Sequence, residues 1–158
     1  MCIRDSSRAI DLIRTGGHLQ HADSTLSNAA ALKGMAGDAG AALLYAREAR
    51  SLLNEHPAAT FQLSAMVNEA QALQVLGRTS EAGRVWQEAL ELCRTAGSLQ
   101  MHALTEHQFA EFNLEAGRIN DAIQHLRAAV ELYSLRGESE LADQLGRQVS
   151  ALEARPSG

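Results

Sequence analysis

Apolar residues recur at intervals of three and four along much of the chain, a spacing typical of amphipathic helices. In the middle of the sequence this pattern predicts one helix that ends at Gly77 and a second that ends at Gly97. The first is marked by Phe61, Ala65, Met66, Ala70, Leu73 and Leu76, and the second by Ala82, Val85, Trp86, Ala89, Leu90, Leu92 and Cys93. Thr79 or Ser80 is expected to cap the second helix, so the segment reads as a helix hairpin.

The same plan recurs at a shift of forty residues. Gly17, Pro57, Gly97 and Gly137 share one column, and Gly37, Gly77 and Gly117 share another. Three further columns hold only small side chains: Ala9, Ala49, Ala89 and Ala129; Ala42, Ala82 and Ala122; and Ala30, Ala70, Ala110 and Ser150. Small residues at fixed positions let helix backbones approach closely. We therefore predict an all-α solenoid of stacked antiparallel helix hairpins, in which each repeat buries its face against its neighbours.

The glycine columns also give the expected boundaries. We expect a partial second helix over residues 7–17, full repeats over 18–57, 58–97 and 98–137, a capping helix over 138–153 and a tail over 154–158. Pro57 is expected to open a helix and Asn120 to cap one. The predicted core consists of Ala30, Ala42, Ala49, Ala70, Ala82, Trp86, Ala89, Ala110, Ala122, Leu126 and Ala129.

Residues 1–6 (Met-Cys-Ile-Arg-Asp-Ser) resemble a translated sequencing adapter, and we exclude them from the reasoning about the fold. On this interpretation the natural sequence begins inside a helix. Ile10, Leu12 and Ile13 then lack the helix that would cover them. We expect such an exposed apolar edge to favour self-association.

These columns resemble the tetratricopeptide repeat (TPR) family, whose pattern places a small residue late in the first helix, a glycine at the turn and alanines in the second helix. The middle repeat carries the pattern in Ala70, Leu73, Gly77, Ala82, Trp86 and Ala89, and the third in Phe109, Ala110, Gly117, Ala122, Leu126 and Ala129. The resemblance covers Ser7 to Leu152 and implies a right-handed superhelix whose concave groove is lined by the first helices.

Two positions depart from the family pattern. Glu69 replaces a residue that is usually aliphatic, and Ala46 lies where Trp86 and Leu126 supply bulk, so we expect Tyr45 to compensate. A period near forty exceeds the usual length of about 34 residues. It is similar to the helical arrays of large bacterial regulators, such as LuxR-type ATP-dependent activators or cyclases with helical tails.

Composition narrows the possible partners. The chain is 46% hydrophobic, but no apolar run approaches the roughly 18 to 20 residues that span a bilayer, so we expect no membrane insertion. The net charge is −5 and the 14 basic residues are scattered, which argues against nucleic acid as a partner. Beyond the adapter, Cys93 is the single cysteine, which suits a reducing, cytoplasmic compartment.

The sequence contains no pattern typical of an enzyme, a metal site or a cofactor site. It lacks a glycine-rich phosphate loop, an HExxH motif and paired cysteines. His102 and His107 are five residues apart and point to different faces of a helix, while His18 and His21 lie near a loop without a third ligand. Cys93 and His125 belong to different repeats. Glu106, Glu111 and Glu115 read as a solvated acidic stripe.

One column on the first helices suggests a binding site. Asn28, Asn68, Gln108 and Gln148 share a position, and we name these four residues the amide ladder. A side-chain amide both donates and accepts hydrogen bonds, so the ladder could pair with the backbone of an extended peptide. The alternative is that these are ordinary solvated side chains on exposed helix faces. The full predicted groove adds Val67, Gln71, Gln74, His107 and Glu111.

The predicted groove also indicates the kind of partner. A clamp for a terminal carboxylate needs Lys or Arg, but the matching positions hold Ser24, Ser27, Ser64, Val67, Gln71, Gln74, His107 and Glu111. Only Arg147, in the final helix, is cationic. Val67, Val75 and Leu114 favour a partner with some apolar side chains. We therefore expect a non-catalytic scaffold that binds a protein or peptide segment; the alternative is a sensor or relay segment of a larger regulator.

Overall fold

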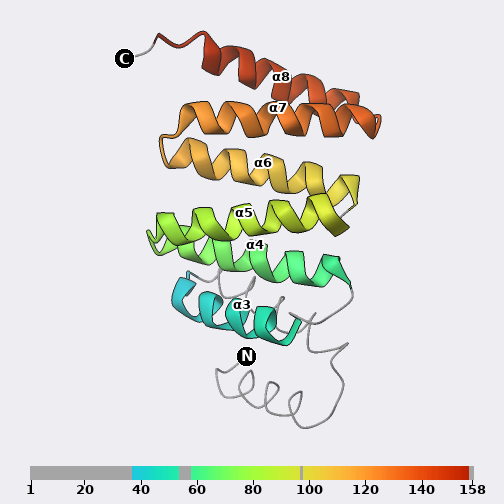
Figure 1. Cartoon of the computed structure of the whole chain (residues 1–158). Coiled ribbons are helices and arrows are strands. Elements are labelled where there is room, and N and C mark those ends of the chain that lie inside the picture. Colours follow the sequence, from blue (N-terminus) through green and yellow to red (C-terminus); the bar gives the residue numbers. More distant parts are fainter. Residues whose placement is uncertain (1–36, 54–57, 97, 157–158) are drawn as a thin grey trace. The chain divides into compact units, whose positions relative to one another are not determined.

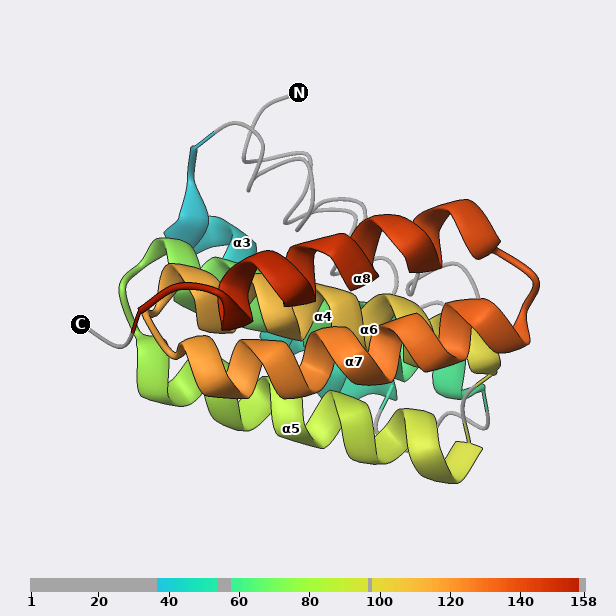
Figure 2. The same cartoon turned by 90° about the horizontal axis from the view of Figure 1, so that it is seen from above.

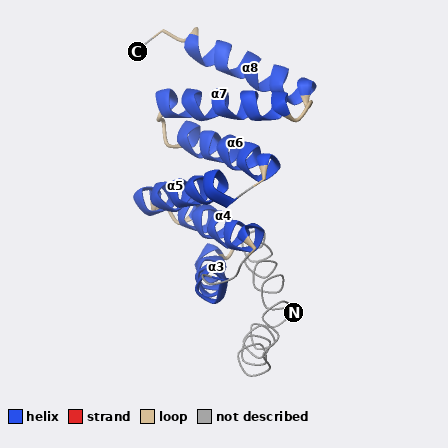
Figure 3. Cartoon of the chain, turned by 45° about the vertical axis from the view of Figure 1, so that its right-hand side comes forward, coloured by secondary structure: helices blue, strands red, loops and turns tan. Residues whose placement is uncertain are grey.

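The computed structural model describes residues 37–53, 58–96 and 98–156, and these form six α-helices (Figure 1). The helices are α3 (Ala39–Leu53), α4 (Ala59–Val75), α5 (Thr79–Ala96), α6 (Leu99–Glu115), α7 (Ile119–Leu135) and α8 (Ser139–Glu153). Each begins twenty residues after the one before it. No strand occurs within these ranges (Figure 3), so the predicted all-α architecture of stacked helices is confirmed for them. The predictions for residues 1–6, 7–17, Ala30 and Pro57 lie outside the described residues.

Glycine determines where several helices end. The φ angles of Gly77, Gly117 and Gly137 are +72°, +74° and +77°, in the left-handed region that disfavours any residue with a Cβ atom. At the first of these turns, the N–H of Gly77 donates to Gln74 O and the N–H of Arg78 donates to Leu73 O. This pair of bonds is the Schellman motif, and it satisfies carbonyl groups that the end of a helix leaves free. The turns at Gly117 and Gly137 contain the same pair of bonds, as the sequence pattern predicted for helix ends.

The Schellman turn leaves no room for the predicted caps at Thr79, Ser80 or Asn120, and those predictions were wrong. Helix α5 begins at Thr79 itself, and α7 begins at Ile119, preceded by Arg118 with no side-chain cap. The residue after the glycine forms hydrogen bonds with both helices. At the second turn, the N–H of Arg118 donates to the preceding helix at Asn113 O, and its carbonyl oxygen accepts from Ala122 N of the following helix. A capping side chain is used before α6, where Ser98 Oγ accepts from Met101 N at 3.3 Å.

The first of two compact units extends to Val85, and in it α3 packs against α4. Ala49, Leu53 and Ala65 make a buried cluster here. Tyr45 packs against this cluster beside the fully buried Ala46, so it supplies the bulk that Ala46 lacks.

Residues 86–158 form the second unit, in which α7 packs against both α6 and α8. Seen from above, α7 lies to one side of both neighbours (Figure 2). Its core includes Leu126, Ala129 and Leu145, and Trp86 stacks on Phe109 with ring centroids 6.0 Å apart. The described alanines of the small-residue columns are all buried: Ala42, Ala49, Ala70, Ala82, Ala89, Ala110, Ala122 and Ala129. Ser150, in the same columns, is exposed.

Within the described ranges, none of the helices combines the length and the apolar character that a membrane crossing requires.

Candidate interaction surface

The residues predicted to line a groove lie on α4, α6 and α8, except Asn28, which is outside the described residues. Gln71 on α4 and Glu111 on α6 are exposed. The other members are half-buried: Val67, Asn68 and Gln74 on α4, His107 and Gln108 on α6, and Gln148 on α8. The described members of the amide ladder therefore share one half-buried position on three helices.

Burial limits what the amide ladder can offer to a partner. Asn68 and Gln74 also interact with other groups of the protein, which uses part of their hydrogen-bonding capacity. Gln71 and Glu111 lie one turn further along their helices and expose their polar groups. The side chains most accessible for hydrogen bonding are thus Gln71 and Glu111.

Apolar side chains are exposed on these helices as well. Val75 on α4 is 72% exposed, Leu104 on α6 is 49% exposed, and Phe61 on α4 is 38% exposed. The sequence interpretation named Val75 but missed Leu104, although Leu104 lies one turn before His107 and Gln108. It also named Leu114, which is half-buried and packs against the core of the second unit.

The charge of these helices is neutral to acidic. Neither α4 nor α6 contains a Lys or Arg residue, whereas Glu111 and Glu115 are exposed on α6. His107 is occupied within the protein, since its Nε2 lies 3.7 Å from Glu111 Oε1 and its ring meets Tyr133 edge-on. These two helices offer no cationic pair to hold a terminal carboxylate.

Glu106 is not part of a solvated stripe, and that prediction was wrong. Its side chain is 3% exposed, and each carboxylate oxygen lies close to a histidine nitrogen. Oε1 lies 3.3 Å from His102 Nε2, and Oε2 lies 2.7 Å from His125 Nδ1. Arg94 lies further away, with its guanidinium 4.0 Å from Oε1. Because a buried carboxylate needs partners, this cluster fixes α6 against α7.

Glu69 has an equivalent role in the first unit. It is also buried, and its two carboxylate oxygens accept from Arg47 Nε at 3.0 Å and Arg50 Nη1 at 2.8 Å. Arg47 reaches Glu81 as well, at 3.4 Å. Glu69 can thus replace the usual aliphatic residue because α3 supplies two guanidinium groups to α4.

The described part of the chain shows no arrangement suited to nucleophilic chemistry. The Cys93 thiol is buried and lies 3.5 Å from Thr105 Oγ1, and burial raises its pKa, with a smaller opposing effect of that hydrogen bond. A raised pKa keeps the thiol protonated and weakly nucleophilic. His125 is bound to Glu106. Among the described residues, no three His, Cys, Asp or Glu side chains gather as metal ligands would.

Comparison with protein families gives a match over almost the whole chain. The family described as "Soluble NSF attachment protein, SNAP" matches residues 6–157. The curated proteins that were searched include no match to this chain. The matching family consists of non-catalytic, helical-repeat scaffolds that bind other proteins, in agreement with the stacked helices of the described ranges.

Proposed function

The chain belongs to the soluble NSF attachment protein (SNAP) family, and we propose that it is a non-catalytic scaffold that binds a segment of a partner protein on its first helices. The observation that supports this most directly is the composition of the exposed α6 face. There Leu104 and the acidic Glu111 are exposed beside the half-buried Gln108. Apolar and polar contacts side by side are typical of protein-binding surfaces.

The chemistry of these faces indicates the kind of segment that would bind. On α6, Leu104 would contact an apolar side chain, while the accessible part of Gln108 would pair with backbone N–H and C=O groups. Glu111 and Glu115 favour a segment that is neutral or positively charged over an acidic one. A negatively charged chain without cations on α4 and α6 suits a protein partner better than a nucleic acid.

Three finer points remain predictions of the sequence. A reducing, cytoplasmic setting is consistent with the buried Cys93 thiol. Self-association through residues 7–17 concerns a segment outside the described residues. A relay role in a larger LuxR-type or cyclase-like regulator is the alternative function.

Site-specific photocrosslinking tests the binding face. A photoreactive phenylalanine analogue would replace Gln71 or Glu111, with Glu131 as the control because it is exposed on α7. After irradiation in a lysate of the source cells, we expect partner adducts at positions 71 and 111 and few at position 131. Equal labelling at all three positions, or labelling at position 131 alone, would contradict the proposal.

Two leucine variants then test the contact itself. Leu104→Ala should weaken capture of the crosslinked partner, whereas Leu135→Ala, on a residue 74% exposed in α7, should not. Both substitutions are at exposed sites and should change stability by less than about 0.5 kcal/mol. Asn68→Ala with Gln108→Ala tests the amide ladder, with helicity measured by circular dichroism because both residues are half-buried. If that double variant kept its binding, the amide ladder would not be part of the binding site.

A further inference from the structure

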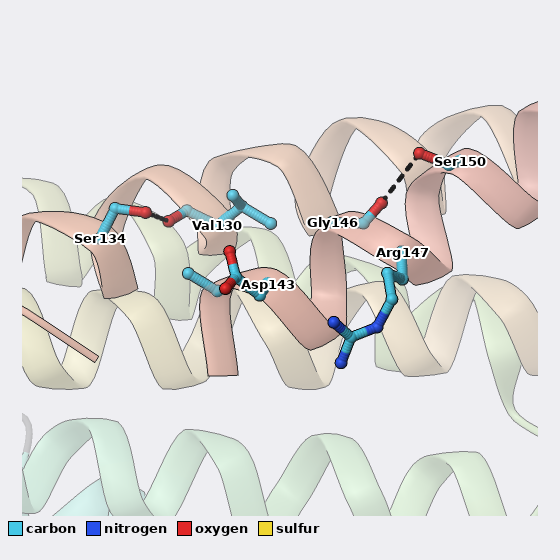
Figure 4. Close-up of a pocket in the computed structure, with 7 residues that line it drawn as sticks. Val130, Ser134, Asp143, Gly146, Arg147 and Ser150 are labelled. Atoms are coloured by element: carbon cyan, nitrogen blue, oxygen red, sulfur yellow. Dashed lines mark hydrogen bonds between the residues drawn. The ribbon is translucent and has the colours of Figure 1, made fainter. Parts of the chain in front are cut away.

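A groove runs between α7 and α8 in the second unit (Figure 4). Its volume is about 480 Å³. Val130 and Ser134 line it from α7, and Asp143, Gly146, Arg147 and Ser150 line it from α8. Apart from Arg147, which shares the column of Val67 and His107 in the predicted groove, none of these residues belongs to the surface proposed above for the partner segment.

The repeat pattern relates this groove to a buried face of α6. Forty residues earlier, α6 has Ala103, Glu106 and Ala110 in the positions that Asp143, Gly146 and Ser150 occupy on α8. These three residues of α6 are buried, and Glu106 bonds to His125 of α7. A following helix thus covers this face of α6, whereas the matching face of α8 is the wall of the groove. The groove therefore corresponds to a face that a neighbouring helix covers on α6.

The α8 face carries two opposite charges. Asp143 and Arg147 are both exposed and lie four residues apart, one helical turn along the same face. Neither forms an ion pair or hydrogen bond with any residue that the structure describes. Gly146 lies between them, and a Cβ atom built there would meet nothing within 4 Å. A glycine inside a helix costs about 0.5 to 1 kcal/mol relative to alanine. Packing within this chain does not require it, but close approach of another backbone would.

We propose that a second copy of this chain occupies the groove, with the two α8 helices antiparallel about a two-fold axis near Gly146. In an antiparallel pair, Asp143 of each copy faces Arg147 of the partner copy. Each charge on this face is therefore paired with the opposite charge on the same face of the other copy. A two-fold contact needs this self-complementarity, and the α8 face has it. Gly146 allows the helices to approach at the axis.

Charge exchange tests the pairing. Asp143→Arg makes both positions positive and Arg147→Asp makes both negative, so each variant alone should weaken dimerisation of the full chain about tenfold or more. The double variant Asp143→Arg with Arg147→Asp restores opposite charges and should dimerise again. An equimolar mixture of the two single variants should form a heterodimer. Analytical ultracentrifugation measures all four cases, and circular dichroism checks that each variant folds.

A cysteine at the axis tests the position of the contact. Gly146→Cys in a Cys2→Ser background should form an intermolecular disulfide on mild oxidation, because the buried Cys93 cannot compete. Glu131→Cys in the same background is the control. A monomeric parent chain would overturn the proposal. So would a dimer that keeps its affinity in both single charge variants, which would instead indicate self-association through the N-terminal edge.

Discussion

The carboxylate of Glu106 on α6 lies 2.7 Å from Nδ1 of His125 on α7. The other oxygen of the same carboxylate lies 3.3 Å from Nε2 of His102, one turn earlier on α6. Glu106 is almost fully buried, while both histidines are about one-fifth exposed. A single acidic side chain therefore joins two helices of one hairpin, and its hydrogen bonds replace the water that burial removes.

Removing this carboxylate should destabilise the second unit. Glu106→Ala deletes the acceptor of two histidines and opens a polar cavity, so we expect the free energy of unfolding to fall by about 2 to 3 kcal/mol. Glu111→Ala is the control, because Glu111 is exposed and only reaches His107 at 3.7 Å, and it should cost less than about 0.5 kcal/mol. Urea denaturation followed by circular dichroism compares the two. Equal effects would mean that the buried cluster contributes nothing specific.

Part of this cluster could have been predicted from the sequence. Residues five apart on a helix point to different faces, so His102 and His107 cannot bind one metal ion together. The same rule separates Glu106 from Glu111 and would have broken up the acidic stripe. His102 and Glu106 are four apart and face each other. The contribution of His125, nineteen residues further along on another helix, depends on how α6 and α7 pack, and no local pattern contains that information.

Substitution by alanine should change the stability of the protein in opposite directions at two glycines that have equally open surroundings. Gly117 has a φ of +74°, and Gly146 is in the interior of α8 without a positive φ; a Cβ atom at either position would meet nothing closer than 4 Å. Gly117→Ala should therefore cost about 1 to 2 kcal/mol from backbone strain alone. Gly146→Ala should stabilise the monomer by about 0.5 to 1 kcal/mol, because alanine favours the helix.

Thermal unfolding measures both glycine variants, at a protein concentration low enough to keep the chain monomeric. A loss of stability in Gly146→Ala under those conditions would show that this glycine packs inside one chain. The interpretation of the α8 face would then have to change.

The glycine turns that end several helices were the most predictable features, because they depend on short stretches of sequence, whereas the caps predicted at Thr79, Ser80 and Asn120 were wrong. Gly77, Gly117 and Gly137 supply a backbone conformation that other residues avoid, and the helices end there. The buried Glu69 was visible only as a departure from the family pattern. Its explanation needs Arg47 and Arg50, which lie on α3 about twenty residues earlier. Tertiary pairing of this kind is not contained in helical periodicity.

Stability should decrease at alkaline pH through Cys93. Burial raises the pKa of this thiol in the folded protein. Above about pH 8.5 the unfolded chain loses the thiol proton while the folded chain still keeps it, so the free energy of unfolding falls until the pH passes the folded pKa. Cys93→Ala should have a lower stability at neutral pH but a shallower decrease between about pH 8 and pH 10. Denaturation curves across this range for both proteins test the difference, and parallel pH profiles would contradict it.

Trp86 gives the sharpest test of core packing. Its side chain is 1% exposed and stacks on Phe109, and its Nε1 has no hydrogen-bond acceptor among the described residues. Trp86→Ala should leave a cavity and cost about 3 to 5 kcal/mol. Trp86→Phe keeps a ring against Phe109 and removes an unpaired buried donor, so it should cost only about 1 kcal/mol.

Because Trp86 is the single tryptophan, both variants have to be followed by circular dichroism and not by tryptophan fluorescence. If Trp86→Phe proved as damaging as Trp86→Ala, the indole N–H would have to bond to an acceptor in solution. The stacking of the ring on Phe109 would then explain only a small part of the stability that Trp86 provides.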